Sequence, residues 1–175
     1  MGLSEEVTVL LACFFAGEDG LLRTKLQKGL YFASQKGILE DSFGRGYYGP
    51  FSPDIANSAE SLVSANFLKE CIEFFPDGKG YNYSLSSDGE KVIPVLKKQM
   101  PDEMIEELDR IIKVCKNHTT SSISIAAKVH YILKRIEVPM TADQIAKQAE
   151  KMRWSISSDE VLEASRLLKA LELIE

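Results

Sequence analysis

Apolar side chains recur every three or four positions through the first third of the chain, the spacing of helices with one buried face. This pattern predicts helices over residues 4–16, 22–36 and 53–66. The composition then changes to aromatic and β-branched residues over 68–75 and 81–85. The intervening segment, Pro76 to Gly80, is a turn by composition, so the two stretches are predicted to pair as an antiparallel hairpin.

Helical spacing returns after the hairpin and continues almost to the end of the sequence. Helices are predicted over 88–100, from Asp102 to about residue 115, over 125–136, and after each of two cap residues, Thr141 and Ser157. Capping boxes are expected at Ser87 with Glu90, Thr141 with Gln144, and Ser157 with Glu160. The short apolar end, 171–174, is a strand candidate.

This order of elements predicts a mainly helical α+β chain in two parts, residues 1–100 and 101–175. Three helices followed by a two-stranded hairpin is the order of a winged helix, with the hairpin as its wing. The second part is a helical unit of helix-turn-helix type, or a second, degenerate winged helix packed on the first. The polar segment 117–122 is the clearest boundary signal.

Composition narrows the classes of function. The 175 residues are 45% hydrophobic, and their net charge of −5 argues against a surface that binds nucleic acid throughout. No metal-binding spacing, catalytic set or phosphate loop is present, so we expect no enzyme, cofactor or metal site. Cys13, Cys71 and Cys115 each lie among apolar residues, which predicts reduced core thiols. With no apolar run that could span a bilayer, a cytoplasmic protein is expected.

The most specific segment runs from Lys25 to Asp54. It contains Lys-Leu-Gln-Lys-Gly-Leu-Tyr-Phe at 25–32 and Tyr-Gly-Pro-Phe-Ser-Pro-Asp at 48–54. In the motif at 48–54, Ser52 can cap a helix, Pro53 suits the first turn of that helix, and Asp54 suits the positive end of its dipole. The structural residues of this motif are taken to be Leu26, Tyr31, Gly49, Pro50, Ser52, Pro53 and Asp54.

These two motifs resemble those of the YwgA-like and Panacea (SocA-like) proteins. The resemblance extends to Tyr-Ser-Leu-Ser-Ser-Asp-Gly at 83–89 and, less specifically, to residues 127–132. It implies a small cytosolic prokaryotic protein. Panacea-type proteins act as antitoxins, and some are adaptors that deliver a partner to a protease. The resemblance therefore implies a non-enzymatic protein-interaction module whose partner is a toxin, a protease component or a second copy of itself.

A possible partner surface combines Lys25 and Lys28 with Arg45, Tyr47 and Tyr48, because arginine and tyrosine are enriched in binding hot spots. Two plainer interpretations stay open at this point: the lysines form a solvated helix face, and the tyrosines are core.

The alternative function is a winged-helix transcriptional regulator that contacts DNA through the basic second helix and Lys79. Against it, the third helix, 53–66, contains no lysine or arginine and carries two carboxylates.

Overall fold

The three helices predicted for the first third are present in the computed structural model, which describes residues 2–175. They are α1 (Glu5–Ala16), α2 (Arg23–Gln35) and α3 (Pro53–Ser64). Ser4 caps α1, and Ser52 caps α3 by accepting a hydrogen bond from the Ile55 N–H. Pro53 lies in the first turn of α3, where its missing N–H costs nothing. The predicted mainly helical α+β class is confirmed.

The predicted hairpin is also present. β4 (Leu68–Phe75) pairs antiparallel with β5 (Gly78–Leu85), and the short β1 (Leu21–Leu22) pairs with the other side of β5. The strand order is therefore β1-β5-β4, with β4 at the edge. The predicted turn was too long, because only residues 76–77 separate the strands. Gly80 belongs to β5, and the Phe75 ring covers it: a Cβ there would lie 3.0 Å from that ring.

A second small sheet was not predicted. β2 (Gly44–Gly46) and β3 (Gly49–Phe51) form a tight antiparallel hairpin between the two helices predicted over 22–36 and 53–66, where no strand was predicted. Strands of three residues with three glycines among them carry too little β-branched and aromatic signal to be recognised. The two residues between them, Tyr47 and Tyr48, therefore form the tip of a turn.

Five helices follow the large hairpin. They are α4 (Ser87–Lys98), α5 (Asp102–Asn117), α6 (Thr120–Ile136), α7 (Ala142–Lys151) and α8 (Ser158–Ala170). The capping boxes at Thr141 and Ser157 are confirmed. The one expected at Ser87 is wrong, because the cap is Ser86, whose hydroxyl accepts from the Gly89 N–H and donates to the Asn66 carbonyl.

The strand expected at 171–174 is also wrong. Leu171 is the C-cap of α8, and Glu172 has a φ of 55°, so the chain turns instead of extending. Its apolar side chains serve the core from this turn, which is why they resembled a strand: Leu171 is fully buried.

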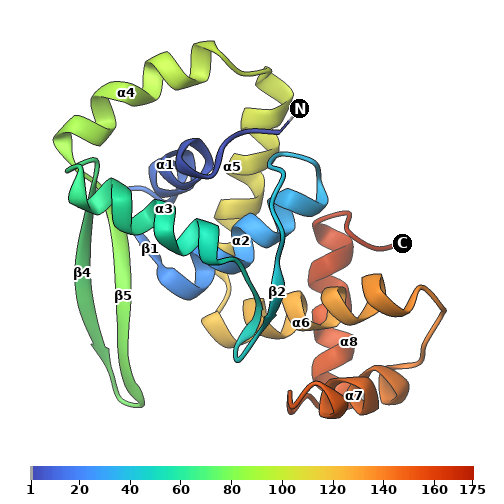
Figure 1. Ribbon diagram of the computed structural model, residues 1–175. Helices are drawn as coiled ribbons and strands as arrows, with labels where there is room; N and C mark the ends of the chain where they lie inside the picture. Colours follow the sequence, from blue (N-terminus) through green and yellow to red (C-terminus); the bar gives the residue numbers. More distant parts are fainter. Residues whose placement is uncertain (1) are drawn as a thin grey trace.

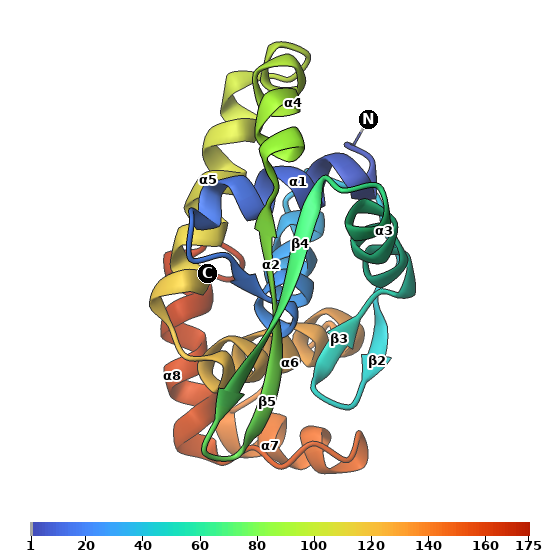
Figure 2. The same ribbon diagram turned by 90° about the vertical axis from the view of Figure 1, so that its left-hand side faces the viewer.

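One hydrophobic core runs from Val9 in α1 to Leu171 after α8. The amphipathic α2 lies at its centre and packs against α5 on one side and α6 on another (Figures 1 and 2). The thiols of Cys13 and Cys115 are buried in this core, and burial raises their pKa values to about 12. Cys71 corrects the cysteine prediction, because it lies exposed on β4.

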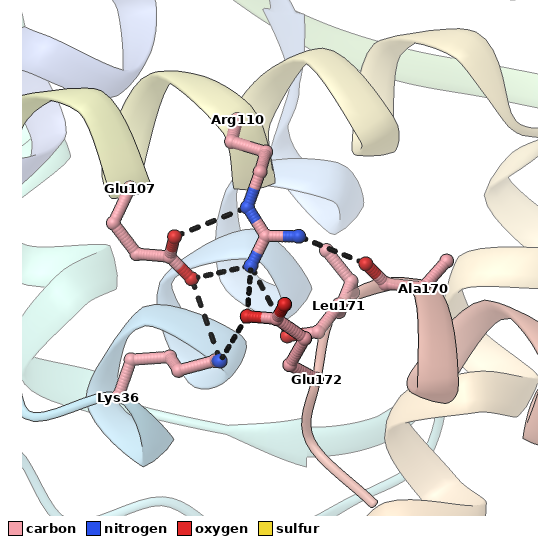
Figure 3. Close-up of polar contacts among 6 residues, drawn as sticks. All are labelled: Lys36, Glu107, Arg110, Ala170, Leu171 and Glu172. Atoms are coloured by element: carbon pink, nitrogen blue, oxygen red, sulfur yellow. Dashed lines mark hydrogen bonds and ion pairs between the residues drawn. The ribbon is translucent and has the colours of Figure 1, made fainter.

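An ion-pair network joins the end of α2 to α5 and to the segment after α8 (Figure 3). Arg110 donates from two nitrogens to both carboxylate oxygens of Glu107, at 3.1 and 2.7 Å. It also donates to the carbonyls of Ala170 and Leu171 at the end of α8. Lys36 lies 3.5 Å from Glu107. Arg110 thus satisfies carbonyls that the helix end leaves without partners.

Candidate protein-interaction site

The two sequence motifs are bonded directly to each other. The Gln27 amide nitrogen donates to the Ser52 carbonyl at 2.9 Å, and its amide oxygen accepts from the Ser52 N–H at 3.0 Å. Both residues are buried. A side-chain amide with one donor and one acceptor side can pair in this way with the N–H and the carbonyl of a single residue. The motif on α2 thereby fixes the start of α3.

Lys28 does not lie on an exposed face, in contrast to the expected Lys25–Lys28 surface. It is 2% exposed, and its ammonium donates to the Pro50 carbonyl at 2.8 Å. Burial, together with the nearby charge of Lys128, lowers its pKa to about 8. The side chain of Lys28 is therefore an interior anchor for β3. Lys25 is half-buried and donates to the Lys116 carbonyl, which ties α2 to α5.

Gly49 occupies a position that favours glycine. Its φ is 115°, and a Cβ there would lie 3.2 Å from Lys128 and 3.4 Å from Lys28. The following Pro50 is buried, and its carbonyl accepts the hydrogen bond from the Lys28 ammonium. The close approach of the two lysines to this backbone holds β3 against α2 and α6.

The tip of the β2–β3 turn stands in solvent. Tyr47 is 84% exposed and Tyr48 64% exposed, and their rings meet edge to face with centroids 4.7 Å apart. The interpretation of these two tyrosines as core is wrong. Arg45 is also exposed, on β2 opposite Pro50. The structure thus brings Arg45, Tyr47 and Tyr48 together on one exposed turn.

A residue far along the sequence supports this turn. The indole N–H of Trp154 donates to the Gly46 carbonyl at 3.0 Å, and the Trp154 ring is buried against Tyr131. Sequence reasoning missed Trp154, although it is the only tryptophan of the chain. A buried indole requires an acceptor for its N–H, and that requirement was the available signal.

A cleft of about 650 Å³ lies beside Tyr48, between the end of the large hairpin and α6. We call it the hairpin cleft, and Figure 2 shows the hairpin crossing in front of α6. Its walls are aromatic and charged, with three cations against two carboxylates. The residues that define it are Arg23, Tyr48, Phe75, Asp77, Lys79, Tyr81, Lys128 and Glu160. Sequence reasoning had identified only Tyr48 and Lys79 among them as possible contacts.

Arg23 organises the wall formed by β5. Its guanidinium lies 4.1 Å from the centre of the Tyr81 ring, and its Nε donates to the Tyr83 hydroxyl at 3.0 Å. Its Nη2 donates to the Glu70 carboxylate at 3.0 Å. The geometry holds the arginine flat on an aromatic face, where cation–π attraction adds to the ion pair. The wall is therefore held in place by contacts within the chain.

The remaining motif residues are structural. Leu26 and Tyr31 are buried, and the Tyr31 hydroxyl lies 2.8 Å from His130 Nδ1. Asp54 is exposed in the first turn of α3, and its carboxylate lies near those of Glu5 and Asp41. Glu5 occupies the first turn of α1, so the carboxylates of Glu5 and Asp54 each lie at the positive end of a helix dipole.

Comparison with known proteins adds no assignment. No protein-family model matches the chain, and no curated protein matches it. Within the described residues, none of the helices has both the length and the apolar character needed to cross a membrane.

Proposed function

We propose that this protein is a non-enzymatic protein-interaction module of the antitoxin or adaptor type, and that it binds a segment of its partner at the hairpin cleft and the Tyr47–Tyr48 turn. The observation that carries the proposal is the exposure of these two tyrosines on one turn, with Tyr48 also lining a preformed aromatic and basic cleft. Large exposed aromatics with an adjacent arginine are the usual anchors of a protein interface. The resemblance to Panacea-type motifs supports the same class.

The chemistry of the cleft favours a partner segment with acidic and aromatic side chains. Lys79 and Lys128 would attract carboxylates, while Tyr48 offers a ring face and a hydroxyl group. Burial lowers the pKa of Lys128, whose ammonium lies 5.8 Å from the centre of the Trp154 ring. A partner carboxylate beside Lys128 would offset the desolvation cost of the buried ammonium charge.

We also infer that residues 5–85 are a winged helix, with β4–β5 as the wing. The order α1-β1-α2-α3-β4-β5, interrupted between α2 and α3 by the small β2–β3 hairpin and with β1 paired to β5, supports this assignment. The DNA-binding alternative has less support. The exposed side of α3 presents Asn57 and Glu60 with no cation, and phosphate groups would be repelled by Glu60 and Asp54. Lys28, expected to contribute to a basic face of α2, is buried.

The test is quantitative affinity capture from the native host, followed by binding measurements with each purified partner. Wild type is compared with Arg45→Ala, Tyr47→Ala and Tyr48→Ala, and Val95→Ala on the exposed side of α4 is the matched control. We expect the tyrosine variants to lose one specific partner at least tenfold, the effect of a hot-spot residue. Folded variants that keep every wild-type partner at unchanged affinity would overturn the proposed site.

A further inference from the structure

The outer edge of β4 is a strand edge without a partner. β4 is the last strand of its sheet, and within residues 2–175 no backbone hydrogen bond reaches its outer side between Lys69 and Phe75. Figure 1 shows it on the far side of β5 from the body of the molecule. Ile72 is 49% exposed and Phe74 82% exposed. Long edges with exposed apolar side chains are templates for another strand.

The pairing within the hairpin determines which peptide groups are free. The Ser86 N–H donates to the Phe67 carbonyl at 3.1 Å, just before the first paired residue of β4. In an antiparallel ladder, inward and outward peptide groups alternate. Lys69, Cys71 and Glu73 therefore direct their peptide groups toward β5. The groups of the residues between them point to the open edge.

We propose that this edge pairs with the same edge of a second copy of the chain, around a two-fold axis at Cys71. A two-fold interface must be self-complementary, and this register meets that condition. Lys69 of each copy then faces Glu73 of the other, so two opposite-charge pairs form. Moving the axis to Glu70 would oppose two glutamates, and moving it to Ile72 would set Lys69 against Phe75.

The side chains that this register requires are available. Within the described chain, the Lys69 ammonium has no ion-pair or hydrogen-bond partner. Glu73 uses one carboxylate oxygen for the Asn82 amide and keeps the other free. On the opposite sheet face, the Ile72 side chains of the two copies become diagonal neighbours and cover each other. Glu70 then faces Ile72 of the other copy, but its carboxylate is already paired with Arg23, so the two Lys69–Glu73 pairs decide the register.

Cys71 provides a direct probe of the axis. It would lie opposite Cys71 of the second copy in a pair without mutual hydrogen bonds, where the Cα atoms come within about 4.5 Å. That distance is within the range that a disulfide or a short bismaleimide spans. Cys13 and Cys115 are buried, so the reagent is directed to Cys71.

The experiment is sedimentation equilibrium of the full chain, with crosslinking by a short bismaleimide. We expect a concentration-dependent dimer that crosslinks through Cys71. Lys69→Glu opposes two pairs of like charges and should weaken the dimer about tenfold. The double variant Lys69→Glu/Glu73→Lys should restore it, while Lys98→Glu on α4 is the control for net charge. A chain that stays monomeric at high micromolar concentration refutes the proposal. A dimer that fails to crosslink at Cys71, or that the double variant does not restore, also refutes it.

Discussion

Gln27 and Ser52 are joined by two hydrogen bonds, in which the side-chain amide of Gln27 pairs with the backbone N–H and carbonyl of Ser52. Twenty-five positions separate them in the sequence, and one lies on α2 while the other caps α3. Ser52 thus has two tasks, since its backbone binds Gln27 and its hydroxyl caps the helix. This relationship explains why the two motifs occur together, because the buried Gln27 amide and the buried Ser52 backbone groups are each other's hydrogen-bond partners.

Replacing Gln27 with methionine should destabilise the protein by about 2–4 kcal/mol. The variant keeps the size of the side chain but leaves the buried Ser52 N–H and carbonyl without partners, each at a cost of about 1–3 kcal/mol. The free energy of unfolding from urea titration measures the loss. Gln35→Met, at the exposed end of the same helix, is the control and should change stability by less than about 0.5 kcal/mol. Equal effects in the two variants would show that the bond to Ser52 contributes nothing.

Gly49→Ala should destabilise the protein by about 1–3 kcal/mol, because alanine is strained at a φ of 115° and its Cβ presses against Lys128. Gly44 is the matched control, since it lies on the neighbouring strand and has open space around its Cα. Thermal unfolding of both variants compares them directly. A melting temperature for Gly49→Ala as high as that of Gly44→Ala would contradict the assigned role.

Arg110→Met should cost about 1–2 kcal/mol of stability. It removes the hydrogen bonds to the Ala170 and Leu171 carbonyls together with the bidentate ion pair to Glu107. Lys91→Met is the control, because its pair with Asp88 is exposed on both sides and is worth little. Chemical denaturation at low and high salt measures both. If the two variants lose the same small amount of stability, the network in Figure 3 does not stabilise the C-terminal segment.

The sequence predicted elements well where periodicity was strong and contacts poorly where they are long-range. Helix α3 and its cap follow from local chemistry, so Ser52, Pro53 and Asp54 were placed correctly. Lys28 was misplaced because a lysine is rarely buried, and only the Pro50 carbonyl explains its position.

The hairpin cleft shows the same limit. Its walls come from α2, the β2–β3 turn, the β4–β5 hairpin, α6 and α8, and no spacing along the chain relates Tyr81 to Lys128. The exposed tyrosines were proposed from composition, but composition left a core position equally open. Their exposure follows from the tight turn between β2 and β3, whose glycine-rich strands gave no signal.

The last prediction concerns pH and the buried His130. Burial, and then the charge of Lys134, lower the pKa of this imidazole to about 4, while the Leu173 carbonyl acts in the opposite direction. Its Nδ1 lies 2.8 Å from the Tyr31 hydroxyl. Burial raises the pKa of Tyr31, so the hydroxyl keeps its proton and donates it to the neutral ring.

An unfolded histidine has a pKa of about 6.5, so below that pH the unfolded chain binds a proton that the folded chain refuses. Stability is therefore full above about pH 6.5 and falls as the pH drops toward 4, by at most about 1.4 kcal/mol per pH unit. Unfolding free energies between pH 5 and 7, above the range in which most carboxyl groups titrate, isolate this effect. His130→Asn, whose amide oxygen can still accept from Tyr31, should flatten the slope. An identical slope in wild type and His130→Asn would show that the ring is protonated in the folded protein.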